Sequence, residues 1–283
     1  MGAEDWRAPL ADCHLCPREC GVNRLKEEKG NCGVGAEAMV ASRGPHFGEE
    51  PPLVGRGGSG TIFFSGCNLH CLFCQNYDIS HQVVGVPAPP ALLADWMLEL
   101  EAMGCHNINF VTPTHVTPQV LEAIRGARAK GLSVPTVYNC GGYEKVETLA
   151  SCAGLVDVYM PDTKFADREA ARQLASAPDY PEVMQAALRE MHRQVGDLVI
   201  EDGLARRGLL VRHLVMPGGL EAARAVIDFL ADAISPRTYI NVMGQYRPVF
   251  RAREVTAISR RPTAEEYRAA RGYALERGLR LAE

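Results

Sequence analysis

The sequence contains 283 residues, of which 47% are hydrophobic and 23% charged, and it has a formal net charge of −4. This length suits one large α/β domain with a small appendage, and the net charge argues against a nucleic-acid-binding field over the whole surface. The first residues, MGAEDWRAPLADC, lack the apolar core of a signal peptide, and no apolar run approaches the length of a membrane span. We therefore expect a cytoplasmic protein with no membrane partner, whose cysteines stay reduced or bind metal.

Residues 1–50 are predicted to form a Cys-rich metal-binding segment. They show little helical or strand periodicity, so something other than a hydrophobic core must hold them. Four thiolates suit a structural zinc ion, whose binding supplies folding energy, and they suit a second iron–sulfur cluster equally well. Reduced cysteines without metal are the remaining alternative. The four cysteines, at C-x2-C-x3-C-x11-C spacing, are Cys13, Cys16, Cys20 and Cys32.

A turn-rich linker over residues 51–60 is expected to lead into the main domain, residues 61–283. There, short apolar segments alternate with helical patterns, of which three cover residues 92–103, 118–131 and 181–195. Alternation of this kind indicates a parallel sheet with right-handed crossovers. Six such units predict a partial (βα)6 barrel of the α/β class, and residues 196–208 are expected to be an insertion or a mobile loop. The predicted strands are 61–64, 107–111, 134–138, 155–160, 209–215 and 239–242.

Three more cysteines, Cys67, Cys71 and Cys74, follow the first predicted strand at C-x3-C-x2-C spacing. Thiolate ligands select zinc, copper(I) or iron–sulfur clusters. Three cysteines on an iron–sulfur cube leave one iron without a protein ligand, and catalysis by a metal needs such an open position. The alternative is a zinc knuckle with His70 as the fourth ligand, although His70 directly precedes Cys71, which makes chelation by both awkward.

Polar side chains also follow or end the other predicted strands. In a barrel, the carboxyl ends of the strands meet at one rim, where catalytic groups collect. Simpler interpretations exist: residues 139–142 could be a turn, and Asp162 with Lys164 a plain ion pair. A charged residue such as Arg212 within an apolar strand is costly unless it is paired. The rim positions are Thr112, His115, Asn139, Cys140, Asp162, Lys164, Arg212, His213 and Gln245.

The cysteine motif after a first strand is the signature of the radical S-adenosylmethionine (SAM) enzymes. The string GCNLHCLFCQNY (66–77) resembles the branch related to pyruvate formate-lyase activating enzymes. The resemblance covers most of the chain and is particularly strong to an uncharacterised group of homologues of those activating enzymes. It continues through the strings NINFVTPTH (107–115), YNCGGYE (138–144), YMPDTKF (159–165), RHLVMPG (212–218) and NVMGQY (241–246).

The resemblance implies a [4Fe-4S] cluster on Cys67, Cys71 and Cys74 that takes part in catalysis and binds SAM through its open iron. It places Phe73 at the adenine-contacting position. The usual glycine-rich motif for the SAM amino group is replaced by residues 107–112, which leaves Asn109 and Thr112 as candidate contacts. Residues 160–164 match the segment that helps to hold the SAM carboxylate. Further SAM or substrate contacts implied at the rim are Asn139, Met160, Asp162, Lys164, Arg212 and His213.

The implied reaction is reductive cleavage of SAM to methionine and a 5′-deoxyadenosyl radical, which abstracts a hydrogen atom. A flavodoxin or ferredoxin-type protein is the expected reductant, and a glycyl-radical enzyme is one expected partner. The N-terminal cysteines depart from the pattern of activating enzymes with auxiliary clusters, where the additional cysteines follow the main motif. Two alternatives remain open: radical SAM modification of a small molecule, a peptide or RNA, and a zinc-stabilised binding module that uses both cysteine sets structurally.

Overall fold

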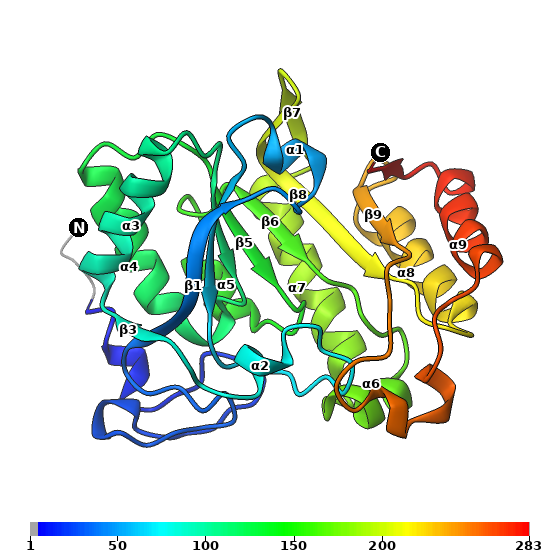
Figure 1. Cartoon of the computed structure of the whole chain (residues 1–283), viewed down its shortest axis with the longest axis horizontal. Helices are drawn as coiled ribbons and strands as arrows, with labels where there is room; N and C mark the ends of the chain where they lie inside the picture. The colour runs from blue at the N-terminus through cyan, green and yellow to red at the C-terminus, as the bar shows by residue number, and fades with distance from the viewer. Residues whose placement is uncertain (1–4, 283) are drawn as a thin grey trace.

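The computed structural model describes residues 5–282, and its centre is a ten-stranded sheet. The strand order is β10-β9-β8-β6-β5-β4-β2-β1-β3, with β7 paired to β8 outside this path. The sheet curves but does not close (Figure 1). The strands are β1 (Ala38–His46), β2 (Ser59–Phe64), β3 (Val86–Ala88), β4 (Ile108–Val111), β5 (Thr136–Cys140), β6 (Val158–Pro161), β7 (Val199–Glu201), β8 (Leu204–Leu214), β9 (Tyr239–Met243) and β10 (Arg280–Leu281).

The predicted α/β class and the partial (βα)6 barrel are confirmed. Strands β2, β4, β5, β6, β8 and β9 correspond to the six predicted strands, and every neighbouring pair among them is parallel. A proline stands in the first turn of α3, α4 and α7, where its missing N–H costs nothing. The helices are α1 (Pro51–Val54), α2 (Tyr77–Ser80), α3 (Pro90–Ala102), α4 (Thr117–Ala129), α5 (Val146–Ser151), α6 (Arg168–Ala175), α7 (Tyr180–Val195), α8 (Leu220–Ala233) and α9 (Ala264–Glu276).

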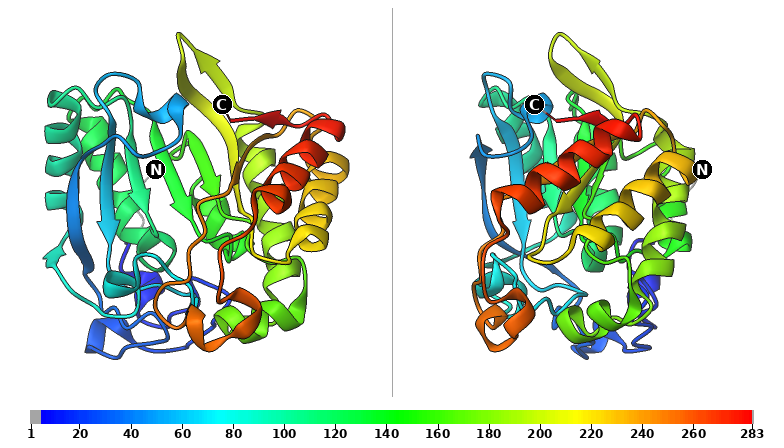
Figure 2. Two further views of the ribbon diagram at one scale, coloured as in Figure 1. Left: turned by 45° about the vertical axis from the view of Figure 1, so that its right-hand side comes forward. Right: turned by 90° about the vertical axis from the view of Figure 1, so that its right-hand side faces the viewer.

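The two faces of the parallel strands have different environments, because side chains alternate along a strand. Phe110 and Tyr138 face outward and pack in the main core beneath the helices. A smaller apolar cluster, which includes Val158, Met160 and Leu210, lies on the opposite face together with Leu53 of α1. We call the space on this inner face the lumen. Figure 2 shows α8 and α9 side by side at the end of the sheet that holds β9, where they pack against each other.

The structure shows two features outside the six units. Residues 196–208 contain an insertion, the first of the two alternatives expected for them, because β7 and the start of β8 form an antiparallel hairpin. Its turn is Asp202-Gly203, and both residues have positive φ, at 51° and 79°. An Asp-Gly pair of this kind is a strong hairpin signal, and it is present in the sequence.

The second feature concerns residues 38–60, which cover the end of the predicted Cys-rich segment and the predicted linker. Strand β1 pairs antiparallel with β2 and so extends the main sheet, although the sequence of residues 1–50 shows little periodicity. The linker range contains α1 and the first two residues of β2. In residues 5–282, no helix combines the length and the apolar character needed to cross a membrane.

Candidate active site

The loop that follows β2 carries Cys67, Cys71 and Cys74 and is anchored at both ends. Ser65 Oγ donates hydrogen bonds to the carbonyl oxygens of Ile79 and Gln82, both at 2.9 Å. Two of the sulfurs are themselves hydrogen-bonded: the backbone N–H of Leu69 donates to Cys67 Sγ at 3.3 Å, and Cys74 Sγ lies 3.2 Å from Ser80 Oγ. Hydrogen bonds to cysteine sulfur are one means of setting the potential of an iron–sulfur cluster.

The three cysteines line one side of a cavity of about 250 Å³ at the carboxyl ends of the parallel strands. This volume is just below the usual range for ligand sites, about 300–1,000 Å³. Besides the three cysteines, eight of the predicted residues line it, so the structure brings together side chains from six strands or the loops that follow them. These residues are Phe73, Thr112, Asn139, Cys140, Asp162, Lys164, Arg212 and Gln245.

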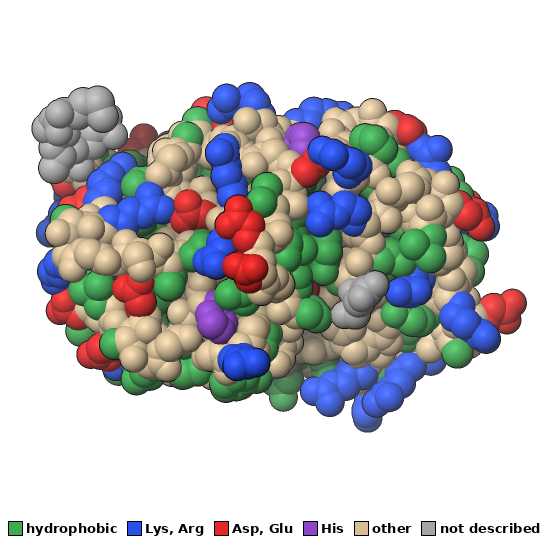
Figure 3. Space-filling view, turned by 90° about the horizontal axis from the view of Figure 1, so that it is seen from above, with side chains coloured by type: hydrophobic (Ala, Val, Ile, Leu, Met, Phe, Trp, Pro, Cys, Tyr) green, Lys and Arg blue, Asp and Glu red, His purple; other side chains and the backbone are tan. Residues whose placement is uncertain are grey.

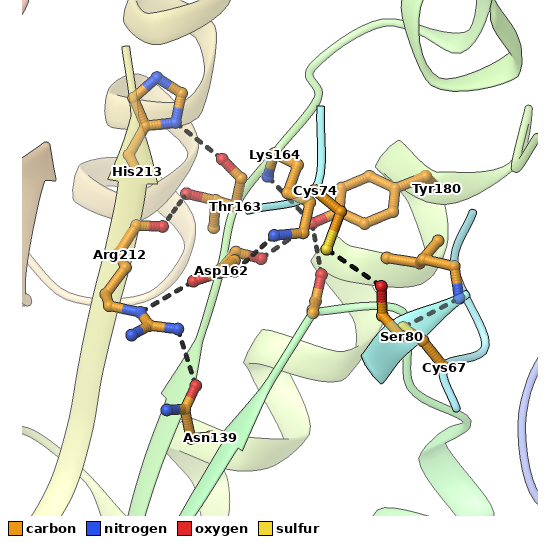
Figure 4. Close-up of polar contacts among 12 residues, drawn as sticks. Cys67, Cys74, Ser80, Asn139, Asp162, Thr163, Lys164, Tyr180, Arg212 and His213 are labelled. Atoms are coloured by element: carbon orange, nitrogen blue, oxygen red, sulfur yellow. Dashed lines mark hydrogen bonds and ion pairs between the residues drawn. The ribbon is translucent and has the colours of Figure 1, made fainter. Parts of the chain in front are cut away.

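A charged network forms the opposite wall of the cavity (Figure 4). Arg212 donates from Nε to Asp162 Oδ1 at 2.8 Å and from Nη2 to Asn139 Oδ1 at 2.7 Å. Lys164 Nζ donates to the second oxygen of Asp162. The three charged side chains are 18–19% exposed. These side chains are partly buried and are paired with one another, and such pairing compensates for the cost of burying a charge.

The network keeps its members ionised. Burial by itself would raise the pKa of Asp162, but the charges of Arg212 and Lys164 lower it below the ordinary value of 3.8. Burial opposes the charge of Lys164, but Asp162 outweighs this effect and raises the pKa of the lysine. The pKa of Arg212 is raised for the same reason. The cavity wall therefore carries two cations and one anion near neutral pH.

Thr112 shows backbone strain at the cavity. Its φ is +60°, a value that is rare for a β-branched residue. The conformation is held by a hydrogen bond from the Thr112 N–H to the Asn139 carbonyl oxygen at 2.8 Å. Strained residues of this kind concentrate at functional sites, where the surrounding structure holds them in place.

Three predicted contacts lie away from the cavity lining. Met160 packs in the apolar cluster of the lumen. Asn109 is fully buried on β4, and both polar atoms of its amide lack a hydrogen-bond partner within the described residues. His213 is on the outer face of β8, since it follows Arg212 in a strand, and its Nδ1–H donates to the Thr163 carbonyl oxygen at 2.7 Å. Their roles in binding stay predictions.

Two acidic residues approach the site without having been expected there. Glu49 and Glu50 are the last residues of the predicted Cys-rich segment, yet a carboxylate oxygen of each lies 3.8–3.9 Å from Arg212 Nη1. Asn241 also donates to Glu50 Oε1 at 3.2 Å. Burial, opposed by Arg212 and assisted by repulsion from Glu50, raises the pKa of Glu49 to about 7. No local pattern in the sequence predicts this contact, because it depends on how the chain enters the lumen before α1.

The N-terminal cysteines Cys13, Cys16, Cys20 and Cys32 surround a second, much smaller cavity of about 10 Å³. Across residues 5–282, no three Cys, His, Asp or Glu side chains are grouped so that they could hold a single metal ion.

Comparisons with known proteins agree with the fold and the cysteine loop. Residues 53–177 match the family described as a 4Fe-4S single cluster domain. An uncharacterized protein of Methanocaldococcus jannaschii is 33% identical over 279 residues, which cover 96% of this chain and 74% of that protein. SuiB of Streptococcus suis, in a crystal structure with bound S-adenosylmethionine, is 12% identical with a TM-score of 0.54. That likeness covers 76% of this chain and 47% of SuiB, so this chain corresponds to about half of SuiB.

A domain of pyruvate-formate lyase-activating enzyme from Bacteroides vulgatus is more distant. It gives a TM-score of 0.45 at 12% identity, covering 59% of this chain and 89% of that domain.

The open parallel barrel, with a cysteine loop after its first parallel strand, defines a class of iron–sulfur proteins. The chain belongs to the same family as the uncharacterized protein of Methanocaldococcus jannaschii. The three thiols of the loop, each buried or half-buried, fit a [4Fe-4S] cluster, the group that the matched domain family describes. Burial raises the pKa of the Cys71 thiol to about 12 and raises that of Cys67 as well, and binding of a metal requires the deprotonated thiolates.

Proposed function

We propose that the chain is a radical SAM enzyme of the activating-enzyme type, which holds a [4Fe-4S] cluster on Cys67, Cys71 and Cys74 and binds SAM beside it. One observation carries the proposal: the three cysteines line the same cavity as the network of Asp162, Lys164 and Arg212. When bound, the cluster and SAM together supply a 5′-deoxyadenosyl radical for hydrogen abstraction.

The residues of the chain hold and orient SAM in this proposal. Lys164 and Arg212 offer positive charge to its carboxylate, and Asp162 holds both cations in place and can accept from its amino group. Phe73 packs edge-on against Phe165 and Tyr246, at 6.0 and 6.1 Å between ring centroids, which suits an aromatic contact to the adenine.

The proposed substrate is a glycyl-radical enzyme, and its support is the resemblance of residues 66–77 to the activating enzymes. A flavodoxin or ferredoxin-type protein is the proposed electron donor. The proposed location is the cytoplasm, where reducing conditions keep cysteines free, as all ten are in this structure. The four N-terminal cysteines are proposed to bind zinc or a second iron–sulfur cluster.

SAM cleavage tests the proposal directly. The full chain is reconstituted anaerobically with iron and sulfide, reduced, mixed with SAM and assayed for 5′-deoxyadenosine. Cys71→Ala should reduce the yield to background, because it removes a cluster ligand. Cys105→Ala is the matched control, since Cys105 is buried away from both cysteine sets. Equal yields from the Cys71 variant and the control would disprove the cluster assignment.

The substrate needs a separate experiment. A glycyl-radical enzyme encoded beside this chain is incubated with the reduced protein and SAM, and its electron paramagnetic resonance (EPR) spectrum is recorded. The expected result is an organic radical signal on that enzyme. SAM cleavage without such a signal would retain the radical SAM chemistry and redirect the substrate assignment to a small molecule, a peptide or RNA.

A further inference from the structure

Exposed aromatic rings gather on the outer side of the Cys67 loop. Tyr77 and Phe250 are 41% and 38% exposed, and their rings stack with 5.0 Å between centroids and 10° between planes. The His81 ring lies 4.6 Å from the Phe250 ring. We call these three side chains the aromatic patch. Apolar surface that is exposed in one place commonly marks a site of contact with a partner.

The apolar surface continues along the chain after α2. Within residues 5–282, ten large hydrophobic side chains are exposed, and five of them are Phe250 or belong to residues 77–86. Among these, Val83, Val84 and Val86 are 37–53% exposed. The other five are scattered through the sequence. The concentration after α2 therefore exceeds the isolated exposed side chains that any protein surface carries.

Helix α2 separates the aromatic patch from the cavity of the candidate active site. Ile79 and Ser80 of α2 line the cavity, whereas Tyr77 and His81, at the two ends of the helix, stack with Phe250 outside it. In the proposed function SAM occupies the cavity. A second protein can therefore approach the patch while SAM stays bound.

The aromatic patch contacts the backbone of the Cys67 loop directly. The His81 Nε2–H donates to the Cys71 carbonyl oxygen at 3.2 Å, and the Arg251 N–H donates to the Leu72 carbonyl oxygen at 3.0 Å. Phe250 has a φ of +52°, which is rare for an aromatic residue, so the surrounding contacts hold its ring in place. An exposed ring is thus two contacts from a cluster ligand, and a short path matters because electron transfer slows steeply with distance.

Positive charge surrounds the aromatic patch. The segment after β9, residues 245–261, contains five arginines and one acidic residue, and one of the arginines is paired with that acid. Arg247 and Arg253 are exposed and have no ion pair among the described residues. Helix α2 contributes one acidic side chain, Asp78. In Figure 1 the segment after β9 runs down to the edge of the molecule that carries α2, so this edge has an excess of positive charge although the whole chain has a net charge of −4.

We propose that the aromatic patch and residues 245–261 dock the electron donor, a one-electron carrier protein with an acidic face around its redox centre. The inference rests on the proposed function, because the electron enters the cluster proposed there. In each encounter the reduced carrier loses one electron and the oxidised cluster gains it, while no bond forms and no proton moves. Opposite charges orient the carrier, and electron-transfer complexes use small interfaces, below about 1,200 Å².

The position of the surface favours an electron carrier over a nucleic acid, the other partner that aromatic rings and arginines suit. Stacking of a base needs a free ring face, but Tyr77 and Phe250 each turn one face toward the other. The contact with Cys71 also has no use in nucleic-acid binding, whereas a carrier must come close to a cluster ligand.

Charge reversal tests the surface through binding. The probes are the flavodoxin and the ferredoxin encoded in the same genome, and isothermal titration calorimetry measures the Kd of each with the full, anaerobically reconstituted chain. One variant that combines Arg247→Glu with Arg253→Glu should raise the Kd of the carrier that binds by about tenfold or more, because like charges would then face each other. Rising salt should also weaken binding to the wild type.

The matched control is Arg56→Glu. Arg56 is likewise exposed and has no ion pair among the described residues, and it follows α1, which lies at the opposite end of the molecule (Figure 1). This control should change the Kd by less than about twofold, because charges beyond the Debye length are largely screened. Equal effects of the control and the double variant would refute the docking surface.

Phe250→Asn tests the aromatic patch separately from the charges. Asparagine tolerates a left-handed backbone, so the variant removes the ring without adding strain at φ +52°. Stopped-flow absorbance should show slower reduction of the cluster by the carrier. Dithionite, a small reductant that needs no docking, should reduce the cluster of the wild type and of this variant at the same rate. An equal loss of rate with dithionite would place the effect in the Cys67 loop and contradict a docking role for the ring.

The outcomes separate this inference from the proposed function, since SAM cleavage driven by dithionite tests the function alone. Such cleavage, together with an unchanged Kd in the double variant, would retain the function and refute the docking surface. Carrier binding that the double variant loses, without any SAM cleavage by the wild type, would do the reverse. If neither carrier binds and the wild type instead binds a single-stranded RNA oligonucleotide through the two arginines, the surface belongs to a nucleic acid and the proposal is wrong.

Discussion

Replacing Asp162 with asparagine removes the carboxylate that pairs with both Arg212 and Lys164. The Arg212 Nε to Asp162 Oδ1 distance is 2.8 Å, and within residues 5–282 Asp162 is the only acidic group in ion-pair contact with Lys164. At that distance the attraction is about 6 kcal/mol for an effective dielectric constant of about 20. Most of this offsets the cost of desolvating the charges, so the attraction is not a net stabilisation.

The expected loss of unfolding free energy in Asp162→Asn is about 2–4 kcal/mol. Breaking a buried ion pair costs about 3–5 kcal/mol, because the remaining charge stays uncompensated. Partial exposure of the side chains reduces that cost, as do Glu49 and Glu50, which lie 3.8–3.9 Å from Arg212. The asparagine oxygen can also keep one hydrogen bond.

The matched control is Asp95→Asn, which breaks a surface pair with Lys130 at 2.6 Å. These side chains are 50–55% exposed, and a pair of this kind is worth about 0–1 kcal/mol. Urea unfolding of the metal-free chains under reducing conditions measures both losses. If Asp162→Asn costs no more than the control, the network does not hold its charges as we describe.

The pH dependence gives a second check on the same variant. The stabilisation by ionised Asp162 is present above the pKa of the unfolded chain, near 3.8, and is lost as the pH falls through the lower folded pKa. The difference between wild type and Asp162→Asn should therefore persist at neutral pH and disappear only in strong acid. A difference that disappears between pH 8 and 6 would refute this assignment.

Three further predictions concern stability. Gly142→Ala should lower the free energy of unfolding in urea by about 2–5 kcal/mol, because the new Cβ would lie 2.3 Å from a backbone carbonyl oxygen and the residue has a φ of +77°. Gly154→Ala is the control, since its φ is +74° but the space around it is open, and it should cost only the backbone strain of about 1–2 kcal/mol. Equal losses in the two variants would contradict the close contact at Gly142. Burial raises the pKa of Glu144 from 4.5 to about 7, so the stability of the wild type should fall by about 3 kcal/mol as the pH rises from 4.5 through 7. Unfolding curves recorded at several pH values should show no such fall for Glu144→Gln. The same fall in the variant would assign the pH dependence to another group. Arg24→Gln removes a buried guanidinium that donates to the carbonyl oxygens of Gly35 and His115 at 2.9 and 2.7 Å, so urea unfolding should show a loss of about 1–3 kcal/mol. An unchanged stability would show that these contacts do not stabilise the fold.

Positive and negative side chains are mixed on one face of the molecule. Figure 3 shows the end of the molecule opposite the Cys67 loop, where Lys and Arg side chains alternate with Asp and Glu. Neither sign forms a continuous field on this face, as a nearly balanced composition leads one to expect.

The sequence by itself determined the cysteine motif and the main repeat. Cysteine spacing is a local property, so it indicates a shared metal centre without any knowledge of the fold. The six parallel strands could be found because each is a short apolar run between helical patterns. The carboxyl ends of parallel strands lie at one edge of the sheet, and Asp162, Lys164 and Arg212 line one cavity there.

Only the tertiary structure decided which rim residues face the cavity. Adjacent residues in a strand point to opposite faces, so Arg212 and His213 could not both line it, and the register that selects Arg212 comes from pairing with β6 and β9. The approach of Glu49 and Glu50 depends on a long-range contact that leaves no local pattern. The same is true of Cys32 against Gly66, where packing between distant segments brings two cysteine sets together that the sequence presents as separate.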